Sequence, residues 1–523
     1  MDNNILGAIS YQGYGPGRCN CSFTNTYPYS IAPRLGAAYQ LDSKTVLRAG
    51  GGISYAPIST FNYITNAAIL GVGFNQLNFP SPAFGIPATT LSQGLVYNPS
   101  QLTTASLAPG LYSAASGTPS AAPFFIDPNA GRAARILQWS IGGERQVARD
   151  LVVEANFVGN RGAWENSSSL LGGLNTPNPA IFAHYGIDPT TAAGQATLTS
   201  TIGSALGKAS GVPLPYPTFP LTQTVLQALR PYPQNSSIGT IYGAPLGDSW
   251  YDSLQAKVTK RTSFGLSLQS AFTWAKTEAN PGGTVNNIFN RSIQKSITST
   301  NQPTLFNTGF TYQLQKYGFL PQSKFLREAI AGWNFAGVLQ YSSGLPIATP
   351  TSSNNMSGWY GQNTLENRVP GQPLYITNPN CNCINPTGQF ILNPAAWANP
   401  VAGQWGTSAP YYSDFRGPRR PAESMSLGRT FRIREKKTLE VRAEFFNIFN
   451  RVYLNTATST TPQGNRGCTI TTPTAGLASS VTVATGSFSC PAGYSSPSGF
   501  GAVSYTSLNT QPRNGQLVAR FTF

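Results

Sequence analysis

The chain has 523 residues, of which 40% are hydrophobic and only 10% are charged, whereas a water-soluble surface usually needs about a quarter charged residues. The 34 Lys and Arg residues exceed the 18 Asp and Glu residues, which gives a net charge of +16. These basic residues are scattered, and their only clusters, KVTKR and FRIREKK, lie beside predicted tight turns. The arrangement therefore argues against a nucleic-acid partner.

Residue composition also restricts the fold class. No run of about 18 apolar residues occurs, which excludes membrane-spanning helices. The 53 Gly and 41 Pro residues disfavour helices, and the 24 Tyr and 28 Phe residues favour strands. An all-β protein with large loops is therefore predicted.

Segments with alternating apolar and polar residues recur in pairs, and each pair predicts two strands joined by a turn. In chain order, the pairs are RLGAAYQL (34–41) with TVLRAGGGISY (45–55), ILQWSIGGERQV (136–147) with LVVEANFVG (151–159), YDSLQAKVTKR (251–261) with LSLQSAFTWAK (266–276), LFNTGFTYQLQK (305–316) with GWNFAGVLQYS (332–342), and SMSLGRTFRI (424–433) with TLEVRAEFFNIF (438–449). The terminal GQLVARFTF brings the count to about 11 strands, or about 12 if NILGAISYQ (4–12) pairs with the first.

Between these pairs lie long stretches that are rich in Ser, Thr, Pro, Gly and Asn. They cover residues 56–133, 163–249, 277–304, 343–421 and 450–513. Such long connections are uncommon in compact soluble domains. Long loops that alternate with short turns are the layout of an antiparallel transmembrane β-barrel of the outer membrane, with loops outside and turns in the periplasm. We therefore expect a multi-pass protein surrounded by outer-membrane lipid and lipopolysaccharide.

The strand faces agree with this interpretation. In the segment 438–449 the apolar residues share one face, which suits lipid, and they are Leu439, Val441, Ala443 and Phe445. The opposite face, which suits a wet lumen, carries Glu440, Arg442 and Glu444. Arg442 between two carboxylates predicts a salt-bridge ladder rather than a catalytic carboxylate pair. A soluble β-sandwich would alternate as well, with its apolar face inward, but the loop asymmetry and the low charge favour the membrane.

The last strand ends in an aromatic residue. Ala519, Phe521 and Phe523 share one face, and this pattern resembles the C-terminal signal that the barrel-assembly machinery reads on outer-membrane proteins. If the short turns are periplasmic, the strand after the last long loop also ends at the periplasmic side. The alternative is an ordinary edge strand that happens to end in Phe.

All six cysteines lie in predicted loops or in the N-terminal segment, and they are Cys19, Cys21, Cys381, Cys383, Cys468 and Cys490. An even number in one compartment predicts disulfides in an oxidising space. A Cys468–Cys490 bond would close a loop of about 22 residues, worth roughly 3 kcal/mol in the chain-entropy model. The two Cys-Asn-Cys pairs remain ambiguous, because a bond across one residue is strained and a thiolate metal site is an alternative.

Sets of catalytic residues are missing from the sequence. His184, in a predicted loop, is the only histidine. This argues against a Ser-His-Asp catalytic triad and against metal sites with several histidine ligands. No nucleophile-elbow or phosphate-loop motif stands out. The segment AGGGIS (49–54) indicates a strand in which neighbouring groups approach the backbone closely, rather than a phosphate-binding loop. We therefore predict no enzyme and no cofactor.

The predicted strands together resemble the C-terminal half of the barrel of a TonB-dependent receptor, of the Oar-like, acidobacterial type. The stretches that carry the resemblance are APRLGAAYQLDSKTVLRAGGGISYAP, LQWSIGGERQVARDLVVEANFVGNRG, YDSLQAKVTKRTSFGLSLQSAFTWAKT, GWNFAGVLQYSSGLPIAT, EVRAEFFNIFNRVYLN and the terminal strand. The resemblance implies a barrel of 22 strands, a plug and TonB-contacting segment in front of it, and a carboxypeptidase-regulatory-like domain. None of these front parts matches this sequence, and MDNNILGAIS lacks the features of a signal peptide. Residues 1–523 are therefore expected to form one partial barrel domain.

The resemblance implies TonB-dependent uptake of an unidentified solute, with TonB acting through the N-terminal region that this sequence lacks. The alternative is a surface interaction or adhesion protein whose long loops bind a partner or glycan without transport. The sequence of the loops does not identify a ligand.

Overall fold

The computed structural model describes most of the chain in several segments. They are residues 13–14, 19–56, 81, 83, 85–94, 124–240, 244–314, 331–354, 356–385, 387–434, 437–451, 454–470, 477–484, 486–503 and 512–523. The possible twelfth strand at residues 4–12 lies outside this described part.

One large antiparallel sheet runs through the molecule, with eleven strands in the order β1-β2-β4-β5-β7-β8-β10-β11-β16-β17-β21. The strands are β1 (Arg34–Asp42), β2 (Thr45–Tyr55), β4 (Arg135–Ala148), β5 (Leu151–Asn166), β7 (Pro245–Ser263), β8 (Leu266–Asn280), β10 (Thr304–Gln313), β11 (Trp333–Ser342), β16 (Arg420–Arg434), β17 (Lys437–Phe446) and β21 (Asn514–Thr522). The short strand β9 (Ser296–Ile297) pairs with β8. Each strand on this path pairs with the next one along it, so the predicted strand pairs and the fold class are confirmed.

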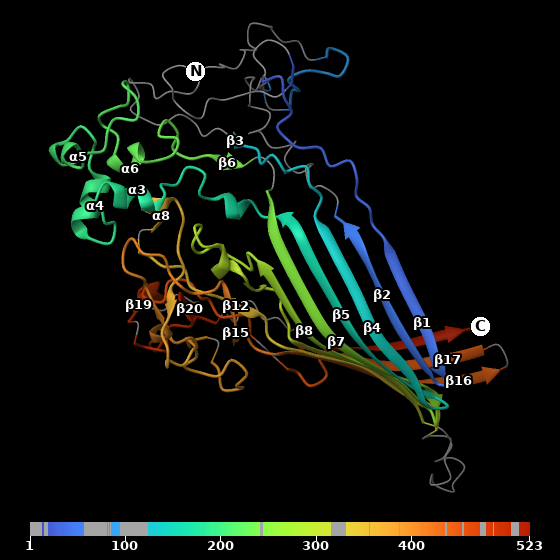
Figure 1. The fold of residues 1–523 in the computed structure, drawn as a ribbon. Helices are drawn as coiled ribbons and strands as arrows, with labels where there is room; N and C mark the ends of the chain where they lie inside the picture. Colours follow the sequence, from blue (N-terminus) through green and yellow to red (C-terminus); the bar gives the residue numbers. More distant parts are fainter. Residues whose placement is uncertain are drawn as a thin grey trace.

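Tight turns join alternate strands at one end of the sheet (Figure 1). The β7–β8 turn shows the local cause, because Phe264 and Gly265 have φ angles of 49° and 80°. Two consecutive residues with positive φ form the type I′ turn, whose twist matches that of paired strands. The other end of the sheet carries the long connections.

The described sheet is open, with β1 at one edge and β21 at the other. Thr522 pairs with Thr438 at the start of β17, so the C-terminus lies at the end of the sheet where β17 begins (Figure 1). The last strand therefore ends at the same end of the sheet as the tight turns, as predicted, while the periplasmic location of this end stays a prediction. The strands form a partial barrel.

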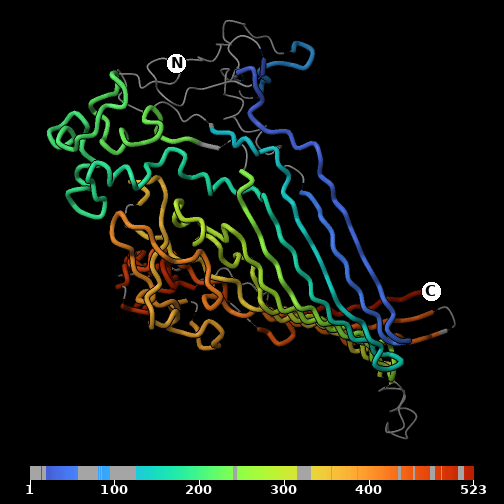
Figure 2. The backbone as a smooth tube through the Cα atoms, viewed as in Figure 1, coloured from blue at the N-terminus to red at the C-terminus, as the bar shows by residue number. Residues whose placement is uncertain are grey.

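The long connections fold into a structure that we call the loop cap, defined as the described residues of 167–240, 281–303, 343–419 and 447–503. Figure 2 shows these segments gathered at the end of the sheet opposite the tight turns. Its helices are η3 (Ser168–Leu171), α3 (Pro179–His184), α4 (Ala192–Thr199), α5 (Ala205–Ala209), α6 (Val225–Ala228), η4 (Arg291–Gln294), α8 (Met356–Tyr360) and η5 (Pro394–Ala396). Its strands, besides β9, are β6 (Gly239–Thr240), β12 (Pro346–Ala348), β13 (Asn367–Arg368), β14 (Trp397–Ala398), β15 (Tyr411–Arg416), β18 (Arg466–Thr469), β19 (Ser480–Val483) and β20 (Ser496–Ser498), and β6 pairs with β3 (Phe124–Phe125). None of the described helices has the length and apolar character needed to cross a membrane.

Apolar side chains of the loop cap form three buried clusters. The first joins two connections that are distant in sequence, because Phe182 and Leu198 share it with Trp359 and Tyr360. Thr176 Oγ1 also donates a hydrogen bond of 2.8 Å to the carbonyl of Tyr360. Burial of such side chains is the main stabilising contribution to a fold, so the loop cap is a packed structure.

Two details of the predicted organisation are wrong. The strands β5 and β7 extend to Asn166 and from Pro245, well beyond the predicted 151–159 and 251–261. Cys468 was also predicted to lie in a loop and not in a strand, but it lies within β18. The added residues of β5 and β7 lie near the loop cap, where the paired charges of Arg161 and Asp252 interrupt the apolar face, and β18 lies within the loop cap.

Candidate functional site

One face of the sheet is covered by large apolar side chains that remain exposed. Register places Leu427, Ala443 and Leu517 in one row across three strands, and Leu517 is 85% exposed. Other exposed members of this apolar face are Leu35, Tyr39, Leu47, Leu137, Ile141, Val153, Phe157, Leu254, Phe272, Trp274, Phe431, Val441, Phe445 and Phe521. An exposed apolar surface of this extent indicates contact with a membrane or a partner.

The opposite, polar face carries ion pairs, some along strand β17 and others between neighbouring strands. Arg442 lies 2.9 Å from Glu440 and 2.7 Å from Glu444, and the amide of Gln516 donates to Glu444. The same face holds the pairs Arg48–Glu144 at 2.9 Å and Lys257–Glu154 at 3.1 Å. The structure thus brings the three predicted charges together as a ladder, with each carboxylate beside the guanidinium.

Near the loop cap, the apolar face changes character and carries charged residues. Arg161 pairs with Asp252 at 2.9 Å and stacks over Trp139, with 5.1 Å from the guanidinium carbon to the ring centroid. Lys295 lies 4.1 Å from the ring centroid of Trp250. Aromatic rings together with paired charges are typical of the level at which a membrane meets water.

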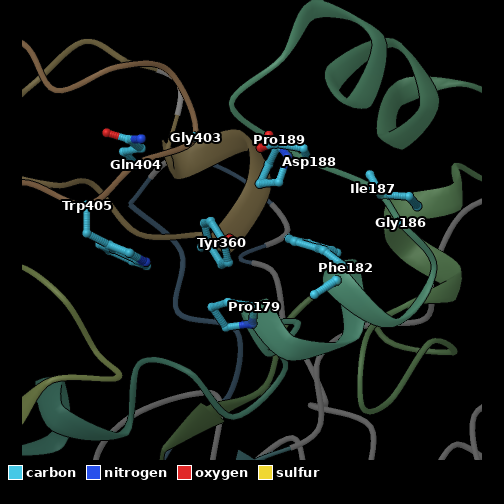
Figure 3. A pocket seen from close by; sticks show the side chains of 11 residues that line it. Pro179, Phe182, Gly186, Ile187, Asp188, Pro189, Tyr360, Gly403, Gln404 and Trp405 are labelled. Carbon is cyan, nitrogen blue, oxygen red and sulfur yellow. The ribbon is translucent and has the colours of Figure 1, made fainter.

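The loop cap contains an open cleft of about 630 Å³. Its lining comes from α3, the turn that follows α3, the end of α8 and the segment 403–405 (Figure 3). The lining residues are Pro179, Phe182, Ala183, Gly186, Ile187, Asp188, Pro189, Tyr360, Gly403, Gln404 and Trp405. Two connections that are far apart in sequence therefore build this cleft jointly.

Aromatic rings form one wall of the cleft. The Tyr360 ring centroid lies 5.7 Å from that of Phe182 and 5.1 Å from that of Trp405. The partly exposed ring of Phe289 lies 6.2 Å from both Tyr360 and Trp405. These separations are those of interacting aromatic pairs, so the rings support one another.

Polar groups at the cleft are few. The indole Nε1 of the half-buried Trp405 is buried and has no hydrogen-bond acceptor, and in Figure 3 it lies at the end of the ring nearest Tyr360. Burial raises the pKa of the Tyr360 hydroxyl to about 12. Hydrogen bonds from the Thr190 side chain and backbone lower the pKa of Asp188. The polar side chains exposed at the cleft are therefore Asp188 and Gln404, since Tyr360 is 2% exposed and Trp405 Nε1 is buried.

A second, smaller cavity of about 290 Å³ lies where β5, β7 and β8 enter the loop cap. Its carboxylates already have partners, since Ser249 Oγ donates to Glu165 at 2.5 Å and Arg291 lies 3.1 Å from Asp248. This arrangement leaves the aromatic cleft as the better candidate for a ligand.

A family model described as an outer membrane beta barrel domain matches residues 2–516. The chain belongs to this family. Its location is therefore the outer membrane, and its apolar face suits lipid. The resemblance to the barrels of TonB-dependent receptors is confirmed at the level of an outer-membrane barrel domain. A search of curated proteins found no match.

Solved structures of outer-membrane receptors show similarity to this barrel domain. The transporter YddB of Escherichia coli is 10% identical with a TM-score of 0.35, over 83% of this chain and 38% of its own. The ferric-catecholate import receptor Fiu of E. coli is 9% identical with a TM-score of 0.32, over 86% and 36%. FpvA of Pseudomonas aeruginosa, bound to a ferric pyoverdine, is 8% identical with a TM-score of 0.32, over 82% and 30%. The barrel domain thus spans about a third of the length of these structures.

The C-terminal residues of the barrel domain lie on its apolar face. Ala519 pairs with Val441 and Phe521 pairs with Leu439 in the register of β17 and β21. The rings of Phe521 and Phe523 stack at 6.1 Å, and Phe523 is 89% exposed. Their role as an assembly signal stays a prediction.

The six cysteines lie in three pairs at bonding distance. Cys468 and Cys490 lie in the loop cap, with their sulfur atoms 2.01 Å apart. The two Cys-Asn-Cys pairs, Cys19–Cys21 and Cys381–Cys383, have sulfur separations of 1.99 Å and 2.13 Å. Their oxidation in the cell stays a prediction.

His184 is the last residue of α3 and packs edge-on against Tyr185 at 4.8 Å between ring centroids. Among the described residues, no three His, Cys, Asp or Glu side chains gather where they could hold a metal ion. The cleft was not predicted from the sequence, whose local signals in this region are the helix caps of α3 to α6.

Proposed function

We propose that the barrel domain is part of a TonB-dependent receptor, in which the loop cap captures a solute outside the cell and the polar face lines its route inward. The observation that carries this proposal is the combination of a lipid-suited apolar face with a packed loop cap that has an open cleft. Outer-membrane barrels place their long connections outside the cell, so the cleft would face incoming solutes.

The polar face supports the same function. Glu440, Arg442 and Glu444 would lie along the lumen, where paired charges keep the wall wettable without exposing an unpaired charge. Residues 1–523 would form one barrel domain, and TonB would act through an N-terminal region outside this sequence. Assembly would use the barrel-assembly machinery, and the apolar face would contact lipid and lipopolysaccharide.

The test is made on the native protein. It is purified from outer membranes of the source cells, weighed by mass spectrometry and passed over immobilised C-terminal domain of TonB. We expect a mass larger than that of the 523-residue chain, a plug-like sequence before Met1, and retention on TonB. The matched control is the 523-residue chain expressed alone, which should not be retained.

Native protein that starts at Met1 and is not retained on TonB would contradict the uptake proposal. That result would favour a surface interaction protein whose loop cap binds a partner without transport.

A further inference from the structure

We propose that the apolar face of the sheet, at the end opposite the tight turns, binds the phosphate group of an acylated lipid through Arg132 and Arg135. This inference rests on the proposed function for the side of the membrane on which this end lies. It names the headgroup chemistry of the lipid that the apolar face contacts.

Two guanidinium groups lie against the indole of Trp164. The guanidinium carbon of Arg132 is 3.3 Å from the ring centroid, and that of Arg135 is 4.4 Å from it. Alternation along β4 places Arg135 on the same face as the exposed Leu137. The pairing of β5 with β7 shifts register at Trp164, whose φ is 61°, and such a bulge re-aims a side chain. The bulge therefore brings the indole to the arginines on the apolar face.

Neither guanidinium has a carboxylate partner among the described residues. The carboxylates at this end of β7 and β8 are already paired, Asp252 with Arg161, Asp248 with Arg291 and Glu278 with Lys276. The sequence of residues 56–126, which precede this region, contains no charged residue. Two cations held at one ring without an anion repel each other, so an anionic ligand would be stabilised here.

Both arginines are accessible to a ligand. Arg132 and Arg135 are partly exposed, and none of their nitrogen atoms is among the buried, unpaired ones of the described residues. Stacking on an indole holds a guanidinium in place and leaves its N–H groups free for oxygen ligands. The pair is therefore positioned before a ligand arrives.

Charged residues of β4 mark the two edges of the apolar face. Arg135 and Arg145 lie ten positions apart on this face, with Leu137, Trp139 and Ile141 between them. Ten residues that rise by about 3.4 Å each, in a strand tilted by about 40°, span a height of about 26 Å, close to the apolar band of an outer-membrane barrel. Arg135 therefore lies at the level of the lipid headgroups, on the side of the long connections.

A phosphate monoester on a lipid matches this arrangement. It carries nearly two negative charges at neutral pH, and guanidinium groups bind its oxygens through paired hydrogen bonds. Farther toward the tight turns, Leu137, Ile141 and Phe157 are exposed and would contact acyl chains. The succession of basic, aromatic and aliphatic side chains therefore favours a phosphorylated lipid over a free phosphate ion.

Three probes separate the phosphate from the lipid. Diphosphoryl lipid A carries phosphate and acyl chains, its dephosphorylated form keeps the chains, and inorganic phosphate has none. Binding of both lipids to the 523-residue chain in neutral detergent is measured by native mass spectrometry, with inorganic phosphate as a competitor. We expect the diphosphoryl form to bind about twenty-fold more tightly than the dephosphorylated form, since each arginine near an anionic headgroup contributes about five-fold. High salt should reduce this difference, and inorganic phosphate should not displace the lipid.

Variants assign the effect to the two arginines. Arg132→Gln and Arg135→Gln should each weaken binding of the diphosphoryl form about five-fold, and the double variant should bind both lipids alike. Binding of the dephosphorylated form should stay unchanged, which also shows that the variants are folded. The matched control is Arg145→Gln, which removes the same charge from the same face of β4 at its other end and should change neither lipid.

Three results would overturn the proposal. They are equal binding of the two lipids by the wild-type chain, a preference for phosphate that survives in the double variant, and an equal effect of Arg145→Gln. Displacement by inorganic phosphate would assign the arginines to a free ion instead. Retention on TonB is measured independently, so native protein that is retained while the chain does not distinguish the lipids refutes this inference alone. The reverse pattern refutes the uptake proposal alone.

Discussion

The buried carboxyl of Glu366 provides the sharpest stability prediction. This residue of the loop cap is 0% exposed. Gln463 Nε2 donates to its Oε2 at 3.1 Å, while Oε1 has no partner. Burial raises the pKa of Glu366 from its ordinary value of 4.5 to about 7, and the hydrogen bond from Gln463 opposes this only in part.

The shift determines how stability depends on pH. Between pH 4.5 and 7 the folded state holds a proton that the unfolded chain has released, so the free energy of unfolding falls as pH rises through this range. A shift from 4.5 to about 7 corresponds to about 3 kcal/mol. This loss is absent below pH 4.5 and complete above pH 7.

Glu366→Gln removes the charge and keeps the shape. The variant should gain up to about 3 kcal/mol at pH 8 relative to wild type and nothing at pH 4. Hydrogen exchange of peptides that span residues 363–369, corrected for the intrinsic rate at each pH, reports the local free energy of opening. The control is Glu144→Gln, since that carboxylate is partly exposed and paired with Arg48, and it should leave the pH dependence intact.

Two results would refute this reasoning. One is a wild-type protein whose loop cap becomes more stable between pH 5 and 8. The other is a Glu366→Gln variant that keeps the wild-type pH dependence, because the charge of Glu366 would then contribute nothing.

Three further predictions follow from the sheet and the cysteines. Deleting Arg520 to Phe523 removes the end of β21 and should leave the protein degraded or periplasmic, so its normal recovery in outer-membrane fractions would contradict the assembly signal. Peptide mapping without reduction should recover Cys468 joined to Cys490, and replacing both by Ser should cost about 3 kcal/mol; free thiols in protein from the cell surface would count against this pair. Arg442→Met should lower stability to urea by about 1 kcal/mol or less, because the ladder is partly exposed, and a larger loss would show that water does not reach it.

The strands could be predicted from sequence because lipid on one side and water on the other impose a period of two. Leu439 and Val441 alternate with Glu440 and Arg442 for this reason. Near the loop cap both faces meet water, as Arg161 on the otherwise apolar face shows, so alternation disappears while backbone pairing continues. The ends of β5 and β7 nearest the loop cap could therefore not be predicted from the alternation of apolar and polar residues.

The loop cap escaped prediction because its described helices have only three to eight residues, too few for a helical period to show. Short-range signals were nevertheless present. Asn178 caps α3 with Pro at the next position, and Thr224 followed three residues later by Gln227 matches a capping box. The cleft itself joins α3 to α8, and no local signal encodes a contact between connections so far apart.

The way the loop cap is held together constrains the order of events during assembly. Phe182 packs against Tyr360, and Phe390 N donates to Phe488 O at 3.0 Å, so the connections 167–240 and 343–419 both contact residues made much later. These contacts therefore form only after the later connection has also crossed the membrane. We expect the loop cap to complete its packing only once β16 and β17 are in place.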